Sequence, residues 1–150
     1  MENVVVVIHL LAATVWVGGT VVLVFAGVPA ISILEGESRG RAMRELGRRW
    51  RPLGYGALFV LALTGADLAH DDLRHCRAPF RTILYVKIGL SVCLAVASYV
   101  HNFVLGPRLQ REIREGRPPR SRPALVVVGW ASLALTLTLP VLGSVLADLA

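Results

Sequence analysis

The side chains of this chain that could do chemistry are a few histidines, one lysine and a group of aspartates. Imidazole nitrogens and carboxylate oxygens are common ligands of copper(II) and zinc, and a histidine can also serve as an axial ligand of haem iron. Placing the charge of a lysine inside an apolar segment costs free energy, so such a lysine usually has a partner for its charge. The candidates are His9, Asp67, His70, His75, Lys87 and His101.

The elements that must position these residues are long apolar segments. The chain has 150 residues, of which 55% are hydrophobic, with a mean hydropathy of +0.62, more apolar than a soluble domain of this size. The apolar runs lack the polar stripe of a soluble amphipathic helix. We therefore expect one all-α integral membrane domain, residues 1–150, built as a four-transmembrane-helix up-down-up-down bundle. The expected spans are about 4–34, 52–69, 80–106 and 124–147, and no internal repeat is visible.

The basic residues indicate how these spans cross the bilayer. Sixteen Lys and Arg residues stand against ten acidic residues, giving a net charge of +6. Most of the arginines fall in segments 36–51 and 107–123, whereas the loop between the second and third spans balances arginine with aspartate. The positive-inside rule places both arginine-rich segments in the cytoplasm and both termini outside the cell membrane. This clustering beside apolar spans predicts a lipid bilayer, and no nucleic acid, as the partner of the arginines.

Several candidate ligands gather on the outer side in this arrangement. His9 lies near the outer end of the first span, and Lys87 lies at a similar depth on the third. Asp67, His70 and His75 lie at the outer end of the second span and in the outer loop. Together with His9 they predict a mixed nitrogen and oxygen site for a metal such as copper(II) or zinc. The alternative for the loop residues is an ordinary solvated loop, since no CxxC or HxxxH pair is present.

His101 lies at a different depth in the bilayer from these residues. It follows Lys87 by fourteen positions on one helix, which corresponds to roughly 20 Å along the axis. His9 and His101 therefore cannot share one metal. A haem would use one of them alone, occupy two separate sites, or pair His9 with an outer ligand. The alternative for His101 is a histidine at the inner end of a helix.

The third span has two distinct faces. Lys87, Ser91, Ser98 and His101 recur at helical spacing and predict a polar face directed into the bundle, while a stripe formed by Gly89, Cys93 and Ala97 predicts a close helix contact on the opposite face. A charge partner such as Asp67 or a haem propionate is one role for Lys87. The alternative is that its ammonium extends to the outer headgroups.

The first span carries a similar face. His9, Trp16 and Thr20 follow one another at helical spacing, and Gly18-Gly19 would let another helix or a flat cofactor approach them. An aromatic residue at this spacing is more often part of the packing, and a buried histidine is often bonded to a neighbouring helix. Further along, Gly27-Val28-Pro29 predicts a bend, because proline removes a backbone donor.

These residues together resemble a known family. The first segment, His9-Leu-Leu-Ala-Ala-Thr-Val-Trp16-Val-Gly18-Gly19, resembles the first-helix motif of the copper-resistance protein D (CopD) family. Similarity continues through Pro29, Arg48-Arg49, Leu63-Thr64-Gly65, Lys87 and the segment from His101-Asn102 to Gly106-Pro107-Arg108-Leu109. The same layout also resembles the HemJ-type protoporphyrinogen oxidases, small four-span proteins associated with haem b. The resemblance implies that His9 is a metal or haem ligand, that Lys87 is a partner for a propionate or substrate carboxylate, and that His101 is a further functional candidate.

Three functions fit these residues, of which the first is the leading hypothesis and the other two are alternatives. The first is a membrane copper-binding or copper-transfer protein of CopD type, with copper held around His9, Asp67, His70 and His75. The second is a haem-b-binding membrane redox protein, and if it is an enzyme it is a haem-dependent oxidoreductase acting on a porphyrinogen or a quinone, with Trp16, Lys87 and His101 as further cofactor-binding candidates. The third is a non-catalytic subunit of a larger membrane complex. Transport by so small a bundle would require a homo-oligomer.

Overall fold

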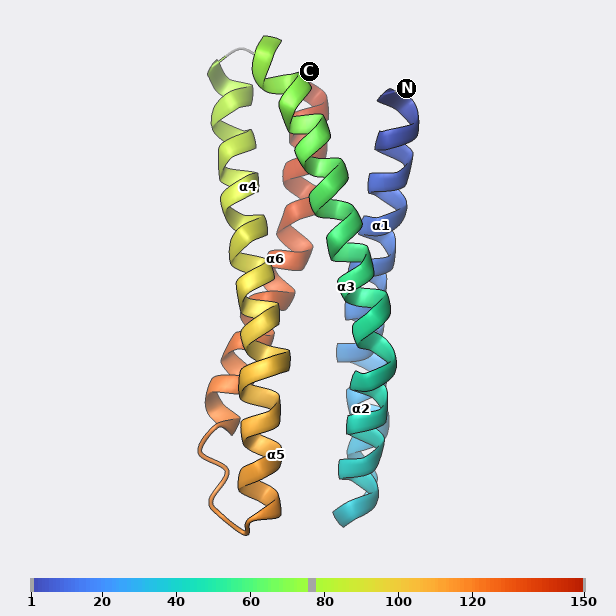
Figure 1. Cartoon of the computed structure of the whole chain (residues 1–150), viewed down its shortest axis with the longest axis vertical. Helices are drawn as coiled ribbons and strands as arrows, with labels where there is room; N and C mark the ends of the chain where they lie inside the picture. The colour runs from blue at the N-terminus through green and yellow to red at the C-terminus, as the bar shows by residue number, and fades with distance from the viewer. Residues whose placement is uncertain (1, 76–77, 150) are drawn as a thin grey trace. The chain divides into compact units, whose positions relative to one another are not determined.

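The structure is a computed structural model that describes the backbone of residues 2–75 and 78–149 and the side chains of residues 4–70 and 79–149. All elements in these ranges are helices, and no strand is present among them (Figure 1). The chain forms two compact units, Met1–Cys76 and Arg77–Ala150, and each is described by itself.

The first unit is a helical hairpin. Helix α1 (Glu2–Val22) continues through a π-helical segment, η1 (Leu23–Gly27), into α2 (Val28–Ser32), and α3 (Gly36–His75) then returns along it. Gly36 has φ 53°, a left-handed conformation that costs glycine little. The turn between α2 and α3 can therefore be short.

The second unit is a hairpin of the same plan. Helix α4 (Ala78–Tyr99) continues through the π-helical segment η2 (Val100–Leu105) into α5 (Gly106–Arg114), and α6 (Arg122–Leu149) returns along it. Gly116, with φ 65°, lies in the connection. In both units the π-helical segment ends within two residues of a proline, Pro29 or Pro107. The wider π turn accommodates a residue that has no backbone N–H to donate, and in the first unit this is where the bend was expected.

Glycines bring the two helices of the first unit close together. A Cβ atom added at Gly19 would overlap the indole of Trp50, and one at Gly54 would lie 3.0 Å from the same ring. A Cβ at Gly27 would lie 3.3 Å from Leu46. The antiparallel register of α1 and α3 therefore places the large Trp50 side chain against Gly19 of α1, while Gly54 leaves room for the same ring one turn further along α3 itself.

The interface of the second unit contains apolar and polar side chains. Leu94, Leu133 and Thr136 are buried between α4 and α6, and Ser98 is only 3% exposed. Outward residues of both units are mainly apolar: Leu11 is 63% exposed, Phe59 64% and Val127 67%. Apolar outer faces around small or polar contacts are the arrangement expected of helices whose solvent is lipid.

Four helical segments in the described part of the chain are long and apolar enough to cross a membrane. They are Val4–Ser32, Gly36–His70, Pro79–Arg114 and Arg122–Leu149. The first and last agree with the expected spans. Segments 36–51 and 107–114, expected as connections, are instead helical, and α3 continues through Pro52. Good helix formers and Glu–Arg pairs one turn apart, at Glu45 with Arg48 and Arg49, favour the helix on the amino-terminal side of that proline.

Candidate functional sites

His9 is held by a hydrogen bond between the two helices of the first unit. Its Nδ1 lies 2.7 Å from Oγ1 of Thr64, and the Thr64 hydroxyl donates its proton to the carbonyl oxygen of Val60 at 2.7 Å. A hydroxyl has one proton, so while Thr64 donates to Val60, Nδ1 of His9 is the donor in the first of these bonds. The neutral imidazole then carries its lone pair on Nε2, the tautomer that a metal-binding histidine needs when its other nitrogen is bonded to the protein.

Gly65 forms a second close contact with the His9 imidazole. A Cβ added at Gly65 would lie 3.4 Å from Cε1 of His9, so the ring packs directly against the α3 backbone. Thr64 and Gly65 are contacts of His9 that were not among the expected site residues. The signal that pointed to them was the Leu63-Thr64-Gly65 segment within the family resemblance.

Trp16 packs in the same interface. It is only 6% exposed, and its ring centre lies 6.3 Å from that of Trp50 with an angle of 35° between the planes. This geometry is typical of an aromatic pair inside a helix interface. The alternative interpretation of Trp16, that it belongs to the packing, therefore has a defined partner on α3, while its role toward a cofactor stays a prediction.

His9, Asp67 and His70, the expected outer metal ligands whose side chains are described, do not form a group. Asp67 and His70 are both exposed on α3, and no three His, Cys, Asp or Glu side chains come together within residues 4–70 or 79–149. The side chains of His75 and Cys76 lie outside the described residues. A site that combined His9, Asp67 and His70 would therefore need a conformation other than this one.

Lys87 is directed along the α4–α6 interface of the second unit. A Cβ added at Gly143 would lie 3.3 Å from its Nζ, so the ammonium group lies against the backbone of α6, and the residue is half-buried. The polar face expected on α4 is only partly directed inward. Ser98 is buried, whereas Ser91 is exposed and donates to the carbonyl oxygen of Lys87 at 2.8 Å.

The opposite face of α4 differs from expectation. The small side chains at Gly89, Cys93 and Ala97 predicted a close helix contact, yet a Cβ added at Gly89 would meet nothing within 4 Å and Cys93 is exposed. The close approaches in this unit lie instead on α6, at Gly129 and Gly143. The reason is that Lys87 of α4 and His101 of η2 need the space that Gly143 and Gly129 leave.

His101 occupies the space at Gly129. It lies in η2, and a Cβ added at Gly129 would be 3.1 Å from its Cε1 and 3.4 Å from its Nδ1. The backbone of Leu125 interacts with the ring, while Nδ1 is buried and has no hydrogen-bond partner in the described part of the chain. His101 therefore differs from His9, whose Nδ1 is fixed by Thr64. Because His9 and His101 belong to different units, the expectation that they cannot share a metal stays a prediction.

The arginine-rich segments contain local ion pairs. Arg48 binds Glu45 through two nitrogens at 2.6 and 2.9 Å, and Arg49 binds the same carboxylate at 2.7 Å. In the second unit Glu112 accepts hydrogen bonds from the backbone and the hydroxyl of Ser121 at 3.0 and 2.8 Å. Exposed pairs of this kind each contribute little to stability.

Comparisons with known proteins found no relative of this chain. No protein-family model matches the chain, no curated protein matches it, and no solved structure matches it. The functional conclusion must therefore rest on the residues and contacts described above.

Proposed function

We propose that this chain is a four-span membrane protein that binds haem b through His9. The observation that carries the proposal is the hydrogen bond from Nδ1 of His9 to Thr64, which orients the ring and leaves the lone pair of the neutral imidazole on Nε2. The resemblance of the segment from His9 to Gly19 to the CopD and HemJ families supports the same residue.

The number of ligands favours haem over a bare metal ion. A copper(II) or zinc ion held by protein alone usually takes three or four donors, and the described side chains offer no group of three His, Cys, Asp or Glu residues. A porphyrin supplies four nitrogens itself, so one well-oriented histidine is sufficient to attach it. The copper-transfer hypothesis stays a prediction that requires His9 to acquire further donors.

The chemistry that haem supplies when bound is one-electron transfer. The protein would contribute the orientation of the imidazole through Thr64 and the close approach of α3 at Gly65. Within the second unit, Lys87, with its ammonium against Gly143, is a candidate partner for a carboxylate group. Whether the protein passes electrons to a quinone or oxidises a porphyrinogen depends on the partner that it meets in the membrane.

The membrane arrangement is part of the proposal. The four apolar segments cross the bilayer alternately, as an up-down-up-down bundle, and the arginines of segments 36–51 and 107–123 lie on the cytoplasmic side. Both termini then lie outside. The apolar outer faces of the helices contact lipid.

An absorption spectrum tests the haem proposal. The protein is produced in haem-replete cells, purified in mild detergent, and compared with His9→Ala and with His70→Ala, a matched change at an exposed histidine. We expect a Soret band in the wild type and in His70→Ala and its loss in His9→Ala. A colourless wild-type protein, or a band that survives His9→Ala, would contradict the proposal, and metal analysis of the same samples would identify a copper protein.

A further inference from the structure

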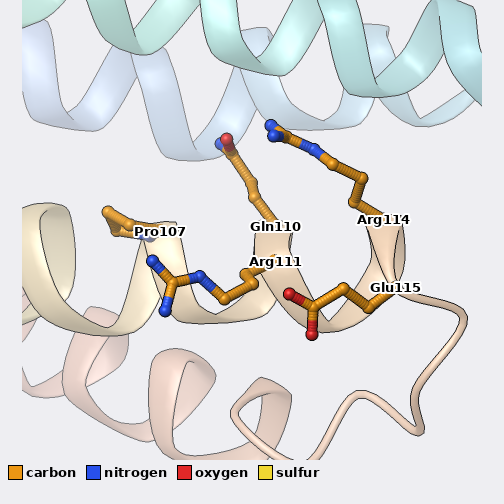
Figure 2. A pocket seen from close by; sticks show the side chains of 5 residues that line it. All are labelled: Pro107, Gln110, Arg111, Arg114 and Glu115. Carbon is orange, nitrogen blue, oxygen red and sulfur yellow. The ribbon is translucent and has the colours of Figure 1, made fainter.

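Helix α5 carries a shallow recess on one face. Its volume is about 250 Å³, and it is lined by Pro107, Gln110, Arg111, Arg114 and Glu115 (Figure 2). Pro107 lies three and four positions before Gln110 and Arg111, and these two lie four and three positions before Arg114, so the lining residues lie on one side of the helix. The recess is therefore open on one side rather than enclosed.

The lining of the recess favours an anion. Arg111 and Arg114 supply two guanidinium groups, and Gln110 extends to the same side of the helix as Arg114 (Figure 2). The one acidic residue in the lining, Glu115, forms an ion pair with Arg117, which is not part of the lining. Guanidinium groups bind phosphate through paired N–H donors, which makes them well suited to a phosphate group.

The position of the recess indicates where such a phosphate would come from. Pro107 lies two residues after Leu105, where the apolar segment ends, and the helix becomes basic from Arg108 onward. When α4 crosses the bilayer, the first turns of α5 therefore lie at the level of the cytoplasmic headgroups. An open recess at that level can receive a headgroup whose acyl chains remain in the bilayer.

We propose that this recess binds the phosphate group of an anionic phospholipid, with Arg111 and Arg114 as the principal donors and Gln110 as a further donor. The proposal rests on the membrane insertion proposed above, but not on haem. It assigns to α5 a specific lipid site, in addition to the general attraction between a basic segment and an anionic membrane surface.

Native mass spectrometry of the full chain in detergent tests the site. Phosphatidylglycerol or phosphatidylcholine is titrated into wild type, into Arg111→Gln/Arg114→Gln and into Arg108→Gln/Arg120→Gln, a control that removes the same charge outside the recess. We expect wild type to prefer phosphatidylglycerol and the recess variant to bind it about tenfold more weakly, with less than about a threefold loss in the control. Glutamine retains helix propensity, and circular dichroism of each variant checks that the helices are intact.

Two results would overturn the proposal. Equal losses in the two double variants would mean that the binding of phosphatidylglycerol depends only on the net charge of the protein. Equal binding of both lipids would mean that the headgroup is not recognised. Inorganic phosphate serves as the competing probe, and we expect it to displace phosphatidylglycerol only weakly. Displacement by phosphate at concentrations similar to those of the lipid would indicate a site for free phosphate instead. Recovery of the protein without detergent would overturn membrane insertion and this lipid site together. The outcome of the haem experiment does not alter the lipid binding measured here.

Discussion

A hydrogen bond of 2.7 Å joins Nδ1 of His9 on α1 to Oγ1 of Thr64 on α3. Because the Thr64 hydroxyl donates to the carbonyl oxygen of Val60, the imidazole is the donor to Thr64. The bond therefore does two things at once. It links the two helices of the first unit and it selects the tautomer of the histidine.

Thr64→Val tests both consequences of this bond. Loss of the acceptor should lower the free energy of unfolding by about 1 kcal/mol and weaken haem binding by about 10- to 100-fold, as changes to the residues that orient a metal ligand do. Unfolding in detergent and titration of the apoprotein with haem measure the two effects. Thr14→Val is the matched control, because Thr14 is exposed and its hydroxyl bonds only within its own helix, to Leu10. Equal effects of the two variants would contradict the orienting role.

Gly19→Ala should destabilise the first unit strongly. The new methyl group would overlap the indole of Trp50, and overpacking of this kind costs about 1–3 kcal/mol. Gly18→Ala, one position away, adds a methyl group that meets nothing within 4 Å, so stability should be unchanged or rise by up to about 1 kcal/mol. Thermal unfolding of both variants measures the difference. Adding Trp50→Leu to Gly19→Ala should recover part of the loss, and the absence of any recovery would contradict the assigned clash.

The two glycines of α6 should respond differently to alanine. A Cβ at Gly129 would lie 3.1 Å from the rigid ring of His101, and we expect a loss of about 1–2 kcal/mol. A Cβ at Gly143 would lie 3.3 Å from Nζ of Lys87, the end of a flexible side chain that can move, so the loss should stay below about 0.5 kcal/mol.

Equilibrium unfolding compares these two variants with Gly89→Ala. Nothing lies within 4 Å of a Cβ at Gly89, so this variant gives the effect of the alanine alone. A loss at Gly143 as large as that at Gly129 would mean that Lys87 is held as rigidly as His101.

The proposed orientation predicts which positions a membrane-impermeant maleimide can reach in intact cells. In a background with Cys76→Ser and Cys93→Ser, Asn3→Cys should react from outside. Ser38→Cys and Pro118→Cys, in the arginine-rich segments, should react only after the membrane is permeabilised, because positive segments remain in the cytoplasm. Labelling of position 38 or 118 in intact cells would reverse or abolish the proposed topology.

Local properties of the sequence were sufficient to predict the helices and much of their extent. Four apolar segments of spanning length, the break at Gly36 and the clustering of arginines depend on neighbouring residues, and the structure confirms the four long helices. The helix α3 extends well beyond the expected second span, 52–69, into a polar connecting segment. Segment 36–51 has no apolar run, but its helix formers and Glu45–Arg pairs stabilise a helix that continues past Pro52.

The contacts between helices were decided only by the tertiary structure. The sequence identified His9, Lys87 and His101 as unusual residues, but gave no register for the helices opposite them. Thr64 lies 55 positions from His9, and Gly143 and Gly129 lie on a different helix from Lys87 and His101. The physical reason is that an antiparallel helix pair settles where its large side chains meet its small ones. That condition involves both helices together, so it cannot be derived from either one alone.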